Sequence, residues 1–295
     1  MTDVVADIGG TNLRVGLVEN AQILRTEVVR GPLPQSEFVP LVRRLLGAGA
    51  GDPGRIVVSV AGPVIDGVGY LTNRDWALPA GQLGSDLNCE ARIINDMAAT
   101  GFSLPHLTGD QVVTVRPGRA GWGGNAQALV VNAGTGFNVC PVRHLDGHTI
   151  TLESETGHAL LPAMVADRLR QALGTTADDF PSIELLLAGP ALPRLTAAAT
   201  AAGHAEPMAL AAELFGMTCG DLALRHWPDQ GLWLAGSAAR AMAREGAAFL
   251  SGLEAAFAAK GMPPAVIDHL RDMPVVEIAD DLAPLRGCVA QLREI

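Results

Sequence analysis

The sequence predicts a protein of the α/β class with two domains, and three observations support this prediction. Apolar runs typical of strands alternate along the chain with segments of helical periodicity, as in sheets covered by helices. The chain has 295 residues, of which 48% are hydrophobic, enough for two cores of ordinary size. Two hairpins containing glycine and threonine lie more than a hundred residues apart, which indicates either an internal repeat or a chance likeness.

Composition and charge argue against several classes of protein. The formal net charge of −10 disfavours a nucleic-acid or anionic-membrane surface, since both favour clustered Lys and Arg. The first residues contain neither a basic segment nor an apolar run of signal-peptide length, and no later run is long enough to span a membrane. The four cysteines have no C-x-x-C spacing. We therefore expect reduced thiols in a cytoplasmic protein, without nucleic-acid or membrane partners.

The first half of the chain predicts strands separated by helices. Residues 4–19 form two strands around a glycine turn. Residues 36–49 have helical apolar spacing after Ser36, a candidate N-cap. The unbroken apolar run of residues 55–64 is typical of a strand that is covered on both faces.

A boundary between domains is expected near residue 107. Residues 69–79 are rich in turn chemistry, and residues 91–105 begin as an apolar strand and continue as a helix. Pro105 and Gly109 then interrupt the pattern before strands begin again.

The second half predicts the same alternation. Residues 126–142 form a second hairpin around a Gly-Thr-Gly turn, and residues 160–225 are rich in Ala and Leu with helical periodicity. Residues 231–253 predict a short strand, a glycine turn and one long helix. A last strand in residues 273–281 and a last helix in residues 282–295 complete the pattern.

The turn at residues 9–12 is suited to binding phosphate. Adjacent glycines leave backbone N–H groups accessible, and Asp7 just before them could hold a hydrated Mg²⁺. An ordinary hairpin explains one such turn equally well. The second turn, at residues 134–136, favours the phosphate interpretation, because two such turns could hold a polyphosphate from both sides.

Two common nucleotide-binding motifs are absent. The sequence contains no G-x-x-x-x-G-K-[ST], and its single lysine, Lys260, lies elsewhere. It also has no G-x-G-x-x-G after the first strand. If the chain binds a nucleotide, it does so by neither a P-loop nor a dinucleotide fingerprint.

Asn95 and Asp96 stand at the carboxyl end of an apolar strand, where α/β proteins place ligands. Asp96 could accept the proton of an attacking hydroxyl, with Asn95 binding a neighbouring hydroxyl. The structural alternative is that Asp96 only caps the following helix.

Two further stretches carry polar groups suited to a ligand. Glu155 and His158, with Glu153 nearby, could bind a polyol, although a metal site or a solvated loop is equally compatible. Gly236-Ser237 lies between a buried strand and a helix, a geometry that suits the ribose or adenine end of a nucleotide. A plain strand-to-helix turn is the alternative there.

In combination, these stretches resemble the bacterial glucokinases, in the sugar-kinase branch of the actin-like ATPase superfamily. The cysteine-rich zinc motif of the related repressor/open-reading-frame kinases is missing, which favours the glucokinase branch. The matching motifs, in family order, are DIGGTNLR (7–14), VAGPV (60–64), LTNRDWALP (71–79), INDMAA (94–99), NAGTGFN (132–138), SETGH (154–158), IELLLAGPAL (183–192) and LAGSAAR (234–240).

The resemblance implies a two-domain actin-like ATPase (ribonuclease H-like) fold with an interdomain cleft. Residues 1–107 would form a small α/β domain, completed by a C-terminal helix at 283–295, and residues 108–282 a large α/β domain. The implied activity is that of a glucokinase, which transfers phosphate from ATP to O6 of glucose and gives glucose 6-phosphate and ADP. Mg²⁺ as cofactor and a homodimer are implied as well.

The resemblance also implies a role for each matching residue. Asp96 would be the catalytic base, and Asp7 would hold Mg²⁺ through water. The residues implied in sugar binding are Asn95, Asp96, Glu155, His158 and Glu184. The residues implied in nucleotide binding are Ala6, Asp7, Ile8, Gly9, Gly10, Thr11, Asn12, Gly134, Thr135, Gly136, Gly236 and Ser237.

The sequence departs from the family pattern at a few places. Thr156 stands where the family usually has a second glycine, and Phe137-Asn138 replaces a common Leu-Gly. Ser237 replaces the second glycine of the adenosine loop, and the helical region between Gly189 and Trp233 is shorter than usual. None of these departures removes a catalytic group.

Three alternatives remain open from the sequence. The first is a kinase for another hexose, such as mannose, fructose or an N-acetylated sugar. The second is a non-catalytic sugar-sensing or regulatory protein of the same fold, against which the retained acids and His158 argue. The third is an actin-like assembly ATPase, for which the polar sugar loops have no obvious use.

Overall fold

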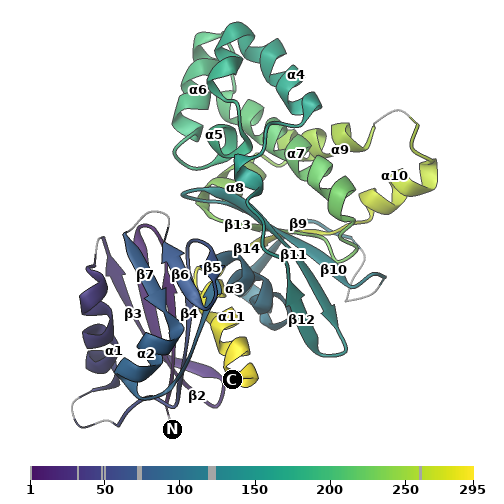
Figure 1. Cartoon of the computed structure of the whole chain (residues 1–295). Coiled ribbons are helices and arrows are strands. Elements are labelled where there is room, and N and C mark those ends of the chain that lie inside the picture. Colours follow the sequence, from purple (N-terminus) through teal and green to yellow (C-terminus); the bar gives the residue numbers. More distant parts are fainter. Residues whose placement is uncertain are drawn as a thin grey trace. The chain divides into compact units, whose positions relative to one another are not determined.

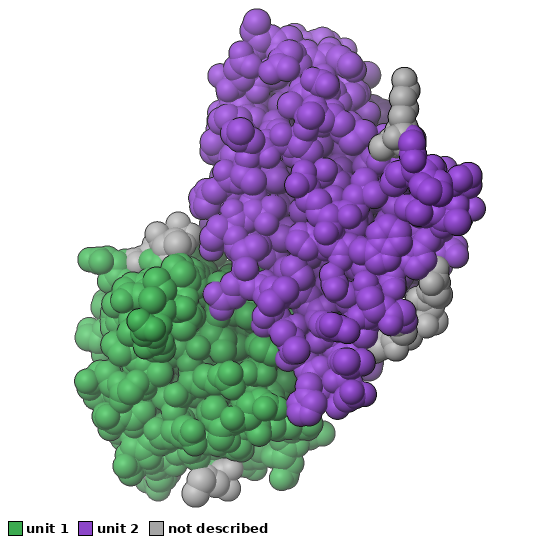
Figure 2. All heavy atoms as spheres, turned by 45° about the vertical axis from the view of Figure 1, so that its right-hand side comes forward, with its two compact units in different colours: residues 1–107, 281–295 green, residues 108–280 purple. Residues whose placement is uncertain are grey.

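A computed structural model of the chain describes residues 2–31, 33–47, 49, 51–71, 75–118, 124–258 and 261–295. The turn predicted within residues 69–79 falls partly on residues 72–74, which lie outside these ranges, as does Lys260. The chain divides into two compact units, shown in Figures 1 and 2. Unit 1 comprises Met1–Leu107 and Asp281–Ile295, and unit 2 comprises Thr108–Asp280.

Unit 1 is built on a five-stranded sheet with the strand order β3-β2-β1-β4-β8. Its strands are β1 (Asp3–Ile8), β2 (Asn12–Glu19), β3 (Gln22–Arg30), β4 (Arg55–Val60) and β8 (Glu90–Asn95). A separate three-stranded sheet consists of β5 (Val64–Ile65), β6 (Val68–Leu71) and β7 (Trp76–Pro79). The helices are α1 (Phe38–Leu46), α2 (Ala80–Leu87), α3 (Asp96–Ser103) and α11 (Ala283–Gln291).

Helices cover both faces of the main sheet of unit 1. Alternate residues of β1, such as Val4 and Val5, point to opposite faces and belong to two different apolar clusters. One cluster includes residues of α1 and α2, and the other includes residues of α3 and α11. Strand β4 is buried on both faces, as predicted for the apolar run of residues 55–64. Figure 1 shows α3 and α11 beside the sheet.

Unit 2 is built on a six-stranded sheet with the order β12-β11-β10-β13-β14-β9. Its strands are β9 (Val112–Arg116), β10 (Gln127–Ala133), β11 (Phe137–Leu145), β12 (His148–Thr151), β13 (Leu232–Ala235) and β14 (Val275–Ile278). Its helices are α4 (Ala163–Leu173), α5 (Ile183–Leu187), α6 (Leu192–Ala201), α7 (Pro207–His226), α8 (Ser237–Ala243), α9 (Ala247–Phe257) and α10 (Pro264–Arg271). The α/β class predicted from the sequence is confirmed.

The two main sheets share one arrangement of strands. In unit 1, the antiparallel strands β3, β2 and β1 are followed by β4 and β8, which run parallel to β1. In unit 2, β12, β11 and β10 are followed in the same way by β13 and β14. This common order favours an internal repeat over a chance likeness of two hairpins.

Two local predictions were wrong. Ser36 is not a helix cap, because it lies within a short 3₁₀ turn and Glu37 occupies the N-cap position of α1. The long helix expected in residues 231–253 is two helices, α8 and α9. Gly246, with φ +22°, separates them with a backbone that a continuous helix does not allow.

Cys140, Cys219 and Cys288 are buried in the cores, and Cys89 is partly exposed. In the described part of the chain, none of the helices combines the length and apolar character needed to cross a membrane.

Helix α11 approaches α3 so closely that a side chain at Gly287 has no space. A Cβ atom added there would lie 1.7 Å from the carbonyl oxygen of Ala99. We therefore expect Gly287→Ala to lower the free energy of unfolding by about 3 kcal/mol, measured by urea denaturation. Gly81→Ala is the control, because Gly81 lies in α2 with nothing within 4 Å of such a Cβ. This variant should be neutral or up to about 1 kcal/mol more stable, and equal losses in both variants would contradict the packing argument.

Candidate active site

Asp7 is a buried carboxylate that two neighbouring strands surround with donors. It lies opposite Arg14 of β2 and opposite Ser59 of β4 in the sheet register. An Arg14 Nη1 atom is 2.9 Å from Asp7 Oδ2, and the Ser59 hydroxyl donates to Asp7 Oδ1 at 2.8 Å. Both carboxylate oxygens are therefore held by residues of the same sheet.

The electrostatic state of Asp7 follows from this environment. Its side chain is only 6% exposed, and burial raises the pKa of the carboxyl above its ordinary value. The hydrogen bond from Ser59 and the positive charge of Arg14 partly offset that effect. Because its oxygens already have partners, Asp7 is suited to act on a metal through water rather than by direct coordination.

The first glycine turn connects β1 to β2. Gly9 N–H donates to the Asn12 carbonyl at 2.9 Å, and a Cβ at Gly9 would lie 3.2 Å from that oxygen. The carbonyl of Thr11 accepts from Gly31 N–H at 3.0 Å, so the turn is tied to the end of β3. Thr11 itself is exposed. The turn is thus a fixed loop with a polar, accessible tip.

Asn95 and Asp96 stand at the junction between β8 and α3. The helix cap is Asn95: its Oδ1 accepts from the N–H groups of Met97 at 2.9 Å and Ala98 at 3.2 Å. Its Nδ2 donates to the carbonyl of Gly62 at 3.0 Å. Asp96 is the first residue of α3, and its Oδ1 accepts from Met97 N–H at 2.9 Å. The N-cap position of α3 therefore belongs to Asn95, and Asp96 follows it in the first turn.

Strand register brings the predicted residues of unit 1 to one edge of the sheet. Ile8 pairs with Val60, and Val60 pairs with Asn95, so the carboxyl ends of these three parallel strands are aligned. The turn at residues 9–12 and Asp96 follow directly from two of these ends. This is the edge at which open α/β sheets bind ligands.

The second glycine turn, in unit 2, is assembled from three chain segments. Gly134 N–H donates to the Gly136 carbonyl at 2.9 Å, and Gly189 N–H donates to the Gly134 carbonyl at 2.7 Å. Gly236 has φ +90°, and a Cβ there would lie 2.3 Å from the Ala133 carbonyl oxygen. Only glycine allows the backbone to approach this closely at positions 189 and 236.

Glu184 lies against the same turn. Its Oε2 accepts from Phe137 N–H at 3.0 Å, and a Cβ at Gly136 would lie 2.8 Å from that oxygen. Glu184 is in the first turn of α5, which Ser182 caps by accepting from Leu185 N–H. The carboxylate is therefore fixed to the hairpin at the start of β11.

Glu155 and His158 are exposed side chains of one short loop beside Glu184. The loop includes a 3₁₀ helix, η4 (Thr156–His158), and Glu155 is its N-cap residue. Gly157 packs against this region, since a Cβ there would lie 2.1 Å from the Phe137 carbonyl oxygen and 3.4 Å from Glu184 Cβ. Burial, together with the nearby charge of Glu155, raises the pKa of Glu153. Ser237, at the start of α8, is exposed as well.

Several residues that support the site were not predicted. Ser59 was detectable, because it is a polar residue inside an otherwise apolar strand. Arg14 and Gly189 lie within the matching motifs, but only the strand register and the backbone contacts reveal what they do.

Among the described residues, no group of three or more His, Cys, Asp or Glu side chains is arranged to hold a metal ion.

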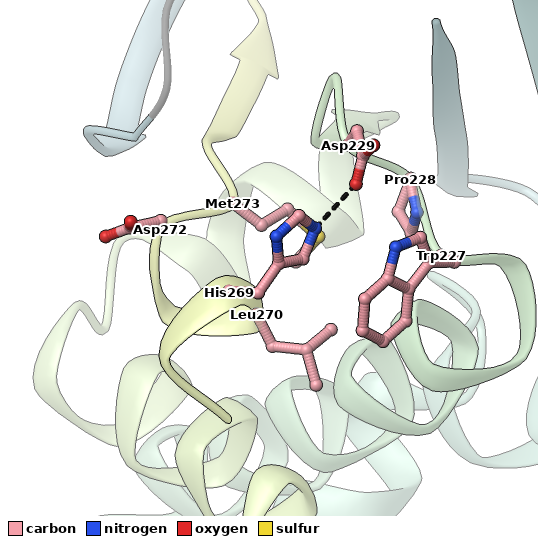
Figure 3. A pocket seen from close by; sticks show the side chains of 7 residues that line it. All are labelled: Trp227, Pro228, Asp229, His269, Leu270, Asp272 and Met273. Atoms are coloured by element: carbon pink, nitrogen blue, oxygen red, sulfur yellow. Dashed lines mark hydrogen bonds and ion pairs between the residues drawn. The ribbon is translucent and has the colours of Figure 1, made fainter. Parts of the chain in front are cut away.

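A small pocket in unit 2 is lined by none of the predicted site residues (Figure 3). There the His269 ring stacks on Trp227, with centroids 4.9 Å apart and planes 6° apart, and its Nε2 is 2.6 Å from Asp229 Oδ1. The cavity has a volume of about 10 Å³, room for one water molecule at most. His269 is thus packed and paired within the fold of unit 2.

The ion pair of Asp7 should control stability in a pH-dependent way. We expect Arg14→Met to lower the free energy of unfolding by about 3 kcal/mol near pH 8, because it leaves a buried carboxylate without its cation. Since burial raises the folded-state pKa of Asp7, protonation favours the folded state, and the loss should shrink as the pH falls towards about 5. Urea denaturation at both pH values measures this.

Arg225→Met is the matched control for this prediction. Arg225 pairs with Asp221 on the surface of α7, where its side chain is 62% exposed. Removing an exposed ion pair should cost less than about 1 kcal/mol at either pH. A loss in Arg14→Met that is no larger, or that grows as the pH falls, would contradict the role given to Asp7.

Comparison with known proteins agrees with this geometry. A sequence profile of the glucokinase family matches residues 4–214. The glucokinase of Erwinia tasmaniensis is 26% identical to this chain over 99% of this chain and 97% of its own length. The structure of a glucokinase from an Antarctic psychrotroph has a TM-score of 0.77 at 24% identity, and the match covers 100% of this chain and 99% of that one.

A ROK family glucokinase from Streptomyces griseus, determined in complex with glucose and AMPPNP, has a TM-score of 0.63 at 17% identity, and the match covers 100% of both chains. These likenesses confirm the actin-like ATPase fold predicted from the sequence. Because the family profile covers more than half of the chain, and the likeness to curated glucokinases covers nearly all of it, the chain belongs to the glucokinase family and is an enzyme of the sugar-kinase type.

Proposed function

We propose that this sugar kinase transfers the γ-phosphoryl group of ATP to O6 of glucose, with Asp96 as the general base. The observation that carries the proposal is the position of Asp96 at the start of α3, directly after β8 and on the same sheet edge as the turn at residues 9–12. The similar protein that was determined with glucose and AMPPNP supports a hexose and a nucleoside triphosphate as substrates.

In this proposal, the two glycine turns bind the phosphates. Gly9 and Gly134 would shape the two turns, since their N–H groups bond to the carbonyls of Asn12 and Gly136. The backbone N–H groups of the other turn residues, Gly10 to Asn12 and Thr135 to Gly136, would contact phosphate oxygens, and Gly236-Ser237 would contact the nucleoside. Ala6 and Ile8, the neighbours of Asp7 in β1, would contribute only their backbone to the nucleotide site. Mg²⁺ would arrive with ATP, and Asp7 would reach it through water, since Arg14 and Ser59 hold its oxygens.

The sugar contacts would come from polar groups at strand and helix ends. Glu155 and His158 are exposed, and Glu184 is held beside them by Phe137 N–H, so their side chains could bind adjacent hydroxyls. Asn95 uses its oxygen for the helix cap and one N–H for Gly62, which leaves its second N–H for a hydroxyl.

The chemical step demands little beyond positioning and a base. Asp96 would accept the proton of the 6-hydroxyl as this oxygen attacks the γ-phosphorus, while ADP leaves. Its bond from Met97 N–H orients the carboxylate before the sugar binds. Holding the hydroxyl and the phosphoryl group in attack geometry contributes a large part of the rate.

We further propose a homodimer, which sedimentation velocity would test.

The base should be detectable by a conservative change. We expect Asp96→Asn to lower kcat for glucose by about 10²- to 10⁴-fold, with the KM for ATP nearly unchanged, in an assay coupled to ADP release. Asp66→Asn is the control, because Asp66 is an exposed turn residue with φ +50°, a conformation that Asn also adopts readily. Full turnover in Asp96→Asn would end the proposal that Asp96 is the base.

Substrate choice and the position of transfer need a separate experiment. With ATP and Mg²⁺, glucose should give the highest kcat/KM in a panel with mannose, fructose and N-acetylglucosamine, and ³¹P NMR should identify the 6-phosphate. The analogue 6-deoxyglucose should not be phosphorylated, because it lacks the attacking hydroxyl. A higher kcat/KM for another hexose would change the assignment to that sugar.

A further inference from the structure

Asn138, near the start of β11, bonds to the backbone on both sides of Glu155. Its Nδ2 donates to the carbonyl of Ser154 at 2.5 Å, and its Oδ1 accepts from Thr156 N–H at 3.1 Å. The Ser154 carbonyl belongs to the peptide unit before Glu155, and the Thr156 N–H belongs to the peptide unit after it. The two bonds therefore fix the backbone at Glu155 from both sides.

The hydroxyl groups of the loop reinforce this arrangement. Ser154 Oγ lies 2.8 Å from the Val139 carbonyl, 3.2 Å from Asn138 Oδ1 and 3.2 Å from Thr156 Oγ1. A hydroxyl donates only one hydrogen, so the shortest contact, with Val139, takes that of Ser154. The Thr156 hydroxyl can then donate to Ser154. The loop is tied to β11 by these side-chain bonds.

Glu155 needs such bonds, because no regular element holds it. Its backbone has φ −125° and ψ 51°, outside the helical and strand regions, and its side chain is exposed. A flexible Glu155 would lose conformational entropy each time it bound a hydroxyl. Fixing the backbone in advance removes part of that cost.

We propose that Asn138 is a positioning residue for the sugar, which acts by holding Glu155 in the orientation that binds a sugar hydroxyl. This rests on the proposed function of Glu155. It also gives a reason for one departure of this sequence from the family pattern, since Asn138 stands where the family usually has a glycine and its side chain makes both bonds. A glycine at position 138 has no side chain to make either bond.

A kinetic cycle tests whether Asn138 acts through Glu155. We expect Asn138→Ala to raise the KM for glucose at least tenfold, while the KM for ATP changes less than twofold. In a Glu155→Ala background, the same change should raise the KM for glucose less than twofold further, because the group that it positions is gone. An unchanged KM in Asn138→Ala, or an equal factor in both backgrounds, would overturn the proposal.

Asn125→Ala is the matched control for this cycle. Asn125 also bonds to backbone with its whole amide, donating to the Trp227 carbonyl at 2.7 Å and accepting from Gln127 N–H at 2.9 Å. It precedes β10, at the opposite end of that strand from the second glycine turn. It should affect thermal stability as Asn138→Ala does, but leave the KM for glucose unchanged.

Amide hydrogen exchange separates this inference from the proposed function. Asn138→Ala should speed exchange at Thr156 N–H at least tenfold, and Asn125→Ala should leave it unchanged, whatever the enzyme phosphorylates. If the wild-type protein phosphorylates no hexose, the proposed function fails. If exchange at Thr156 is the same in wild type and Asn138→Ala, the positioning role fails, whether or not the enzyme is active.

Discussion

The register between parallel strands is the constraint on which the candidate site of unit 1 depends. Val60 pairs with both Ile8 and Asn95, so three strands end at the same level. Because the strands end at one level, the residues that follow them in the sequence lie along the same edge of the sheet. These residues include the turn at residues 9–12 and Asp96. The same register places Arg14 and Ser59 on either side of Asp7. A slip by one residue would turn the Asp7 side chain to the other face of the sheet.

The glycine turn of unit 2 is held in place by contacts of a different kind. Its strand order repeats that of unit 1, but its turn is held by close backbone contacts from Gly189 and Gly236. Such contacts replace side-chain packing by direct hydrogen bonding or van der Waals contact between main chains. The result is a turn whose shape depends little on side-chain rotamers. A phosphate group, which is recognised through N–H groups, is well matched to a surface of this kind.

The sequence was informative where chemistry depends on residue order along the chain. The strand that ends at Asn95 and the two glycine turns were predicted because each is a contiguous pattern. The partners of those patterns were not predicted, because Ser59 and Asn138 act through contacts with residues distant in sequence. The break between α8 and α9 was also missed, since Ala-rich sequence on both sides of Gly246 continues the helical pattern. Local patterns identify the chemistry, and the contacts that orient it need the fold.

Unit 1 is built from two separate segments of the chain, and this affects the order in which the two units can fold during synthesis. Helix α11 packs against α3, and Cys288 Sγ lies 3.6 Å from the Ala6 carbonyl, so one apolar cluster of unit 1 is incomplete without it. A ribosome reaches α11 only after it has synthesised all of unit 2, roughly ten to thirty seconds later at ~5–20 residues per second. During that interval one face of α3, the helix that begins with Asp96, lacks its partner. Unit 2 has no such delay, so it is the unit that can complete its core first.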